Sequence, residues 1–126
     1  MSTFAVLAFL DAVRGHLRAH VLPAPVGVQV TTWTKPVTVM LDEQGVTRLA
    51  GALVKWANTL TEVSASVWRT PGGDSVHLDV SGRVPSGVPV RVYGGVAYDA
   101  SVFPDLPADT HQDVEVAQLR AWEVAA

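Results

Sequence analysis

The residue types best suited to chemistry alternate with valine and leucine in the middle of the chain. His77 and Asp79 are two residues apart in one apolar segment, and Arg91 and Tyr93 are two apart in another. Trp68 occupies the corresponding position of a third segment. Because successive side chains of a strand point to opposite faces, we expect these five residues to gather on one face of a sheet.

This group offers two chemical interpretations. A histidine beside an aspartate and serines is typical of a nucleophile, a base and a group that orients the base. However, the Cβ atoms of His77 and Asp79 are about 7 Å apart on one strand, and the chain has no G-x-S-x-G motif. The pattern therefore favours a binding surface, and we assign no catalytic residue. The alternative is a small hydrolase or anion-binding enzyme that uses His77 and Asp79, with Arg91 holding the anion.

A second pair of histidines lies near the N-terminus. His16 and His20 are four residues apart, but the zinc-protease motif requires glutamate after the first histidine, and Leu17 stands there. Cationic side chains near the end of a helix are explained by the negative end of its dipole. His111 and Asp113 are further ligand types that the sequence does not place. We therefore predict no metal site.

Composition excludes several classes of protein. The 126 residues are 48% hydrophobic and 17% charged, which suits one domain spanning residues 1–126. No cysteine is present, and neither glycine pair belongs to a nucleotide-binding motif, so no cofactor is predicted. A net charge of −3 disfavours nucleic acid. The longest apolar run, residues 4–10, is too short to cross a membrane, and its arginines follow it, so we expect a cytoplasmic protein.

Periodicity predicts two helices with two strands between them. The first helix covers residues 3–20, where one narrow sector holds the apolar side chains Val6, Leu10, Val13, Leu17 and Val21. Alternating valines predict strands over residues 26–31 and 37–41. The second helix follows Asp42, an expected N-cap, and its amphipathic pattern covers residues 46–60.

Three further strands are expected over residues 62–68, 76–81 and 88–93. A three-residue turn, residues 85–87, sets Val80 opposite Val92 and Asp79 opposite Tyr93. A four-residue loop over residues 70–73 sets Val67 opposite Val76 and Ser66 opposite His77. Both registers keep every valine of these strands on one face.

The order α-β-β-α-β-β-β predicts an α+β fold. We expect a two-layer sandwich with a mixed, mostly antiparallel sheet of about five strands and two helices on its valine face. Residues 97–112 are expected to form a surface connection. Residues 113–126 fit either a strand followed by a short helix or one continuous helix.

The leading functional hypothesis is a non-enzymatic protein-interaction or self-associating accessory module, from a bacterium or phage and acting as a homodimer. It would bind through the second face of the sheet, which carries Trp68, His77, Asp79, Arg91 and Tyr93, or through a free strand edge. Trp122 and the C-terminal tail provide an alternative cover for Trp68 within the same chain. Nucleic-acid binding through Arg14, Arg18 and the neighbouring histidines is the weakest hypothesis.

Overall fold

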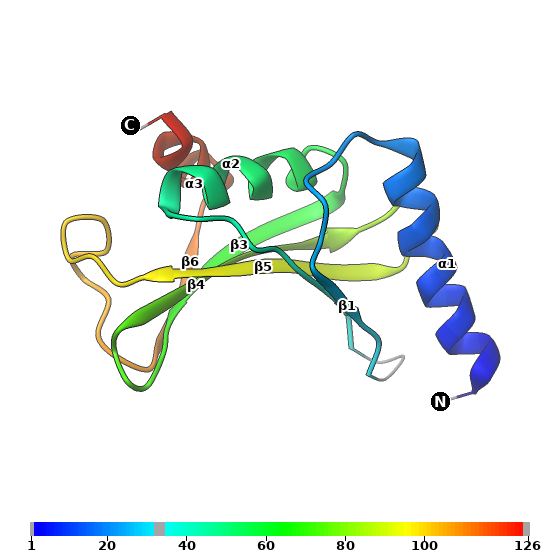
Figure 1. The fold of residues 1–126 in the computed structure, drawn as a ribbon, viewed down its shortest axis with the longest axis horizontal. Helices are drawn as coiled ribbons and strands as arrows, with labels where there is room; N and C mark the ends of the chain where they lie inside the picture. The colour runs from blue at the N-terminus through cyan, green and yellow to red at the C-terminus, as the bar shows by residue number, and fades with distance from the viewer. Residues whose placement is uncertain (1, 32–34, 125–126) are drawn as a thin grey trace.

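The predicted α+β class is confirmed by the structure, a computed structural model that describes residues 2–31 and 35–124. Figure 1 shows three helices and one mixed sheet in the described residues. In chain order the elements are α1 (Thr3–Ala19), β1 (Gly27–Gln29), β2 (Val37–Met40), α2 (Val46–Ala57), β3 (Thr61–Arg69), β4 (Ser75–Arg83), β5 (Pro89–Ala97), β6 (Thr110–Val114) and α3 (Val116–Val124).

The sheet has six strands in the order β1-β2-β5-β4-β3-β6, one more than expected. β2 runs parallel to β5, and all other neighbouring pairs are antiparallel. The extra strand, β6, begins inside the predicted surface connection and pairs with β3. The C-terminal segment is therefore a strand followed by a helix, the first of the two alternatives.

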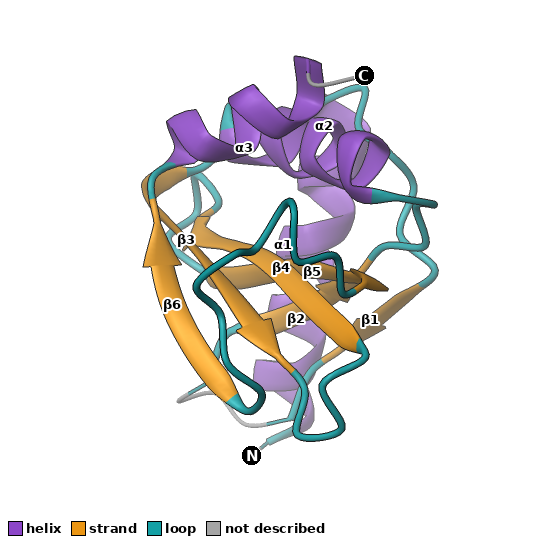
Figure 2. Ribbon diagram, turned by 90° about the vertical axis from the view of Figure 1, so that its left-hand side faces the viewer, coloured by secondary structure: helices purple, strands orange, loops and turns teal. Residues whose placement is uncertain are grey.

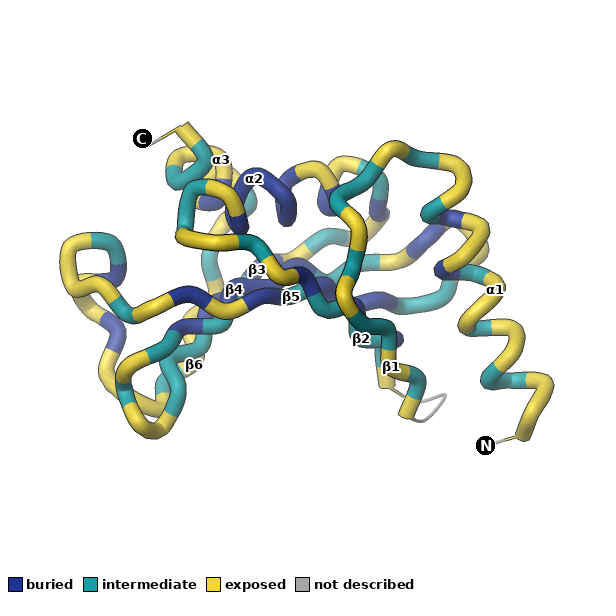
Figure 3. Tube along the Cα trace, viewed as in Figure 1, coloured by how far each residue is buried: buried dark blue, intermediate teal, exposed yellow. Residues whose placement is uncertain are grey.

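The valine face of the sheet is covered by α2 and α3 (Figure 2). Most of α2 is buried, as Figure 3 shows, and its Leu49, Leu53 and Trp56 are almost fully enclosed. The valines of β2, β4 and β5 face these side chains from the sheet. Each such side chain removed from water contributes about 1.5–3 kcal/mol, so this layer is the main source of stability.

The first helix, α1, is placed differently from α2 and α3. It lies at one end of the sheet and is inclined past the plane of the strands, so the second helix across the valine face is α3 (Figure 1). Val13 and His16 are its buried residues, whereas Phe4 is 86% and Leu7 51% exposed. None of the helices in residues 2–31 and 35–124 is long and apolar enough to span a membrane.

Two local predictions are wrong. Asp42 does not cap α2, because the N-cap position is held by Gly45, whose φ of +85° suits glycine, and no side chain caps the helix there. The register of β3 and β4 differs by two residues from the predicted one. Val67 pairs with Leu78 and not with Val76, while the predicted β4–β5 pairs are present.

Candidate functional site

The five residues predicted to share a face do so on the side of the sheet opposite α2 and α3. Trp68 comes from β3, His77 and Asp79 from β4, and Arg91 and Tyr93 from β5. Directly paired residues of neighbouring strands have side chains on the same face, and the pairs Trp68–His77 and Asp79–Tyr93 tie the three strands together. In Figures 1 and 2, no helix lies across this open face.

Four rings form a continuous row across β6, β3, β4 and β5, in the order His111, Trp68, His77 and Tyr93. Adjacent ring centroids are 5.4, 5.2 and 5.4 Å apart along it. The Arg91 guanidinium carbon lies 4.6 Å from the centre of the Tyr93 ring, in a cation–π contact that ends the row. We call His111, Trp68, His77, Tyr93 and Arg91 the aromatic row.

The two-residue difference in register determines the centre of this row. The predicted pairing set Ser66 opposite His77 and placed Trp68 with Ser75 at one end of the group. In the structure Trp68 is opposite His77 on one side and opposite His111 on the other. The indole therefore lies between two imidazoles, and its Nε1 also donates a hydrogen bond of 3.4 Å to Asp109.

The four rings of the row do not lie in one plane, because Trp68 and His77 meet edge to face with an interplanar angle of 84°. The planes of Trp68 and His111 are within 14° of parallel, with centroids 5.4 Å apart. Carbon atoms of neighbouring rings stay about 3.5 Å apart, so such rings overlap with an offset and do not lie side by side in one plane. The Trp68 and His111 rings therefore partly cover each other, which reduces the ring surface left for stacking with a base or a sugar ring.

Asp79 lies next to the row and holds two neighbouring side chains, Ser66 and Arg91, through its carboxylate. Its Oδ2 accepts hydrogen bonds from Nε of Arg91 at 3.0 Å and forms an ion pair with Nη2 at 2.9 Å. Its Oδ1 accepts a 2.8 Å hydrogen bond from the Ser66 hydroxyl. The side chain is mostly buried, and a buried carboxylate is tolerated only when it is paired in this way.

These contacts give no support to the enzymatic alternative. Among the described residues, Asp79 is hydrogen-bonded to Ser66 and Arg91 and not to His77, so it does not orient the imidazole. The Ser66 hydroxyl donates its proton to a carboxylate that is already charge-paired. A base-activated nucleophile requires the reverse order, with the hydroxyl donating to the histidine.

The pKa of His77 lies below its ordinary value of 6.5. Burial of the ring is the largest cause, and the positive charge of Arg91 adds to it. The negative charge of Asp79 acts in the opposite direction. His77 is therefore neutral at pH 7 and belongs to the row as an aromatic ring more than as a cation.

Sequence reasoning missed the contribution of β6. His111 and Asp113 lie on the open face because they pair with Trp68 and Ser66. The signal was present in the alternation of Thr110, Gln112 and Val114 with these two residues. It was obscured by the Pro- and Asp-containing stretch before it. Trp122, the predicted alternative cover for Trp68, packs edge-to-face on Phe103, with centroids 5.2 Å apart.

The second histidine pair lies far from the row. His16 is buried against α2, and its ring centroid is 4.6 Å from that of His20. Within the described part of the chain, no group of three or more histidine, aspartate or glutamate side chains is arranged to hold a metal ion.

The fold and the row together define an α+β sandwich with one covered and one open sheet face. No family model, curated protein or solved structure matched this chain in the comparisons. Function must therefore be argued from the chemistry of the surfaces themselves.

Proposed function

We propose that this protein is a non-enzymatic, self-associating module whose open sheet face binds the same face of a second copy. The observation that carries the proposal is the aromatic row on a face that no described helix crosses. Trp, Tyr and Arg are enriched in protein interfaces and dominate their binding energy. An antiparallel sheet can present one face to solvent, but several aromatic side chains gathered on that face are typical of a protein interface.

Charge favours a second copy over other partners. Asp113 is exposed on the β6 side of the face and forms no ion pair with any described residue. Arg91, on the β5 side, uses Nε and Nη2 for Asp79, and its Nη1 bonds to no described residue. The face therefore has an unpaired carboxylate at one side and a free guanidinium N–H at the other.

A two-fold axis brings these two groups together. In the proposed face-to-face dimer, the two-fold axis lies between the two sheets, parallel to the strands and above the boundary of β3 and β4. Because β5 and β6 are equally far from that boundary, the rotation places β5 of one copy opposite β6 of the other. Packed sheets are about 10 Å apart, a gap that Arg91 and Asp113 side chains bridge from opposite sides. Because the contact is isologous, it forms twice in each dimer.

Nucleic acid is a poorer match for the same face. Its affinity depends on neutralised phosphates, and this chain has a net charge of −3. Arg91 is already paired with Asp79, and Asp113 would repel a phosphate. The rings also partly cover one another in the pairs Trp68–His111 and His77–Tyr93, which leaves less ring surface for an incoming base.

Sedimentation velocity over a concentration series tests the proposal. We expect a concentration-dependent dimer, and Trp68→Ala should raise its Kd about thirtyfold, equivalent to about 2 kcal/mol for a central interface aromatic. Asp113→Arg should weaken it at least about tenfold, because it places two positive charges together in each contact. Asp42→Arg, at an exposed carboxylate in the loop before α2, is the charge-reversal control and should leave the Kd unchanged.

Two results would refute the proposal. One is a single monomeric species up to the highest soluble concentration. The other is a dimer that Trp68→Ala and Asp113→Arg leave intact while both variants retain the wild-type circular dichroism spectrum. A dimer of the second kind would form through another surface, such as the free edge of β6.

A further inference from the structure

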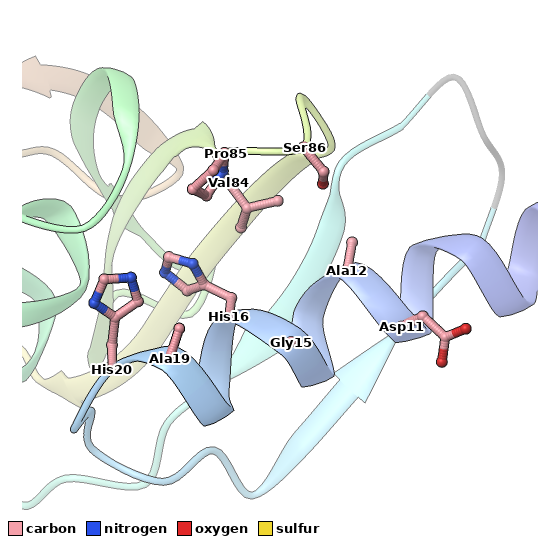
Figure 4. A pocket seen from close by; sticks show the side chains of 9 residues that line it. All are labelled: Asp11, Ala12, Gly15, His16, Ala19, His20, Val84, Pro85 and Ser86. Carbon is pink, nitrogen blue, oxygen red and sulfur yellow. The ribbon is translucent and has the colours of Figure 1, made fainter.

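A cavity lies between α1 and the turn that joins β4 to β5, at the end of the sheet beside α1 (Figure 1). Figure 4 shows the nine residues that line it, six from α1 and its C-cap and three from the turn. Its volume is about 290 Å³, close to the lower end of the usual range for small-molecule sites. Carbon atoms of Ala12, Gly15, Ala19, Val84 and Pro85 contribute much of its wall.

His16 is the buried polar side chain in this wall, and its hydrogen bonds define its tautomer. Nε2 of His16 lies 2.8 Å from the Thr59 hydroxyl. That hydroxyl donates its single proton to the Trp56 carbonyl oxygen at 2.7 Å. The Thr59 oxygen must therefore accept from His16, so the proton of the neutral imidazole is on Nε2 and the lone pair is on Nδ1.

Nδ1 is the unused acceptor of this ring. His16 is 4% exposed, and no described residue hydrogen-bonds to Nδ1. In the described part of the chain, no buried side-chain nitrogen or oxygen lacks a partner. Nδ1 therefore keeps some accessible surface, and the cavity that His16 lines provides it.

We propose that this cavity binds a small, mostly apolar alcohol or phenol, whose hydroxyl donates a hydrogen bond to Nδ1 of His16. The lining favours an apolar body, since carbon surface gains by excluding water. A neutral imidazole nitrogen can only accept, so the ligand must carry the donor. A cationic ligand is disfavoured, because Asp11, the carboxylate at the edge of this lining, is paired with Arg14.

Gly15 gives a way to close the cavity without touching His16. A Cβ atom built on Gly15 meets nothing within 4 Å, so a larger side chain enters open space. Gly15→Leu should therefore fill the site and retain the fold. Ala8 lies two turns earlier on the same side of α1 and outside the lining, so Ala8→Leu is the matched control.

The probes are phenol and anisole, observed by ¹H–¹⁵N NMR titration of the full chain. Anisole has the same ring but its oxygen carries a methyl group, so it cannot donate. We expect phenol to shift the amide signals of Gly15 and Ala19 and to bind at least about tenfold more tightly than anisole, the effect of one buried hydrogen bond. Gly15→Leu should abolish these shifts, and Ala8→Leu should preserve them.

Three results would overturn the inference. Phenol could leave the amides of residues 12–20 unshifted up to its solubility limit. Phenol and anisole could bind with equal affinity, which would show that Nδ1 accepts nothing from the ligand. Phenol could also bind Gly15→Leu as well as it binds the wild type, which would place the ligand elsewhere. None of these results bears on the open face, because the aromatic row lies outside this cavity.

Discussion

The two histidine-bearing regions differ in what each leaves available to a ligand. His16 is enclosed between α1 and α2, and its contact with Thr59 fixes one tautomer. His77 is half-buried in the aromatic row, and no described residue forms a hydrogen bond with its ring nitrogens. His16 therefore presents one nitrogen to a small cavity, whereas His77 is one ring of a broad surface.

Electrostatics acts in the same direction at both sites. Burial lowers the pKa of each histidine, and electrostatic repulsion lowers it further, from His20 at His16 and from Arg91 at His77. The difference lies in Asp79, which raises the pKa of His77, while His16 has no such opposing charge. A lowered histidine pKa therefore does not reveal whether a site holds a ligand or builds a surface; the geometry around the ring does.

The largest expected difference between the two sites is in stability. His16→Ala should lower the free energy of unfolding by about 2–3 kcal/mol, because it leaves a void beneath α1 and removes the donor to Thr59. His77→Ala should lower it by about 1 kcal/mol, the contribution of ring contacts on an open face. Urea unfolding followed by circular dichroism measures both.

Equal losses for these two variants would contradict the comparison. They would mean that the row is as well packed as the interior beneath α1. To separate stability from association, both variants should be compared at a concentration where the wild type is monomeric.

A smaller effect is expected from pH. Because the folded-state pKa of both histidines is lowered from 6.5, the unfolded chain takes up protons first as the pH falls. Stability is thus full above the unfolded pKa, declines as the pH falls through about 6.5, and levels off below the folded pKa. The slope is at most about 1.4 kcal/mol per pH unit for each histidine.

Single substitutions show how much each histidine contributes to the pH dependence of stability. His16→Gln and His77→Gln should each flatten the dependence of stability between pH 7 and pH 5, since each removes a histidine whose folded-state pKa is lowered. Urea midpoints measured across this range provide the test. A wild type whose stability rises as the pH falls from 7 to 5 would show that the sign is wrong.

The alternation of valines predicted which residues share a face of the sheet. It did not determine the strand register, because registers that differ by two residues place the same side chains on the same face. A slip of one residue would turn His77 toward the core, and the pattern excludes it. A slip of two keeps every side chain on its own face, so the pattern accepts Val67 opposite either Val76 or Leu78. The β3–β4 loop decides between them, and in it Gly73 has a φ of +81° while the Thr70 amide donates to the Ser75 carbonyl.

The cavity beside α1 could not be predicted from local patterns. The spacing of His16 and His20 indicates that they share one side of a helix. It carries no information about Thr59 or the turn at Val84, which lie far along the chain and meet His16 only after α2 and the sheet have packed. The tautomer, and hence the free nitrogen, depends on those distant partners.

The smallest expected effects come from the glycine beside each histidine. Gly15 lies next to open space in a helix, and a Cβ built on Gly95 in β5 lies at an ordinary contact distance of 3.6 Å from Cδ2 of His77. Alanine at either position should raise the free energy of unfolding by about 0.5–1 kcal/mol, because glycine loses more backbone freedom on folding. Gly94→Ala is the contrasting control, since its Cβ would come within 2.6 Å of Leu49 and should destabilise the fold. Thermal unfolding of the three variants checks these signs, and a loss of stability for Gly15→Ala would show that the space beside α1 is closed in solution.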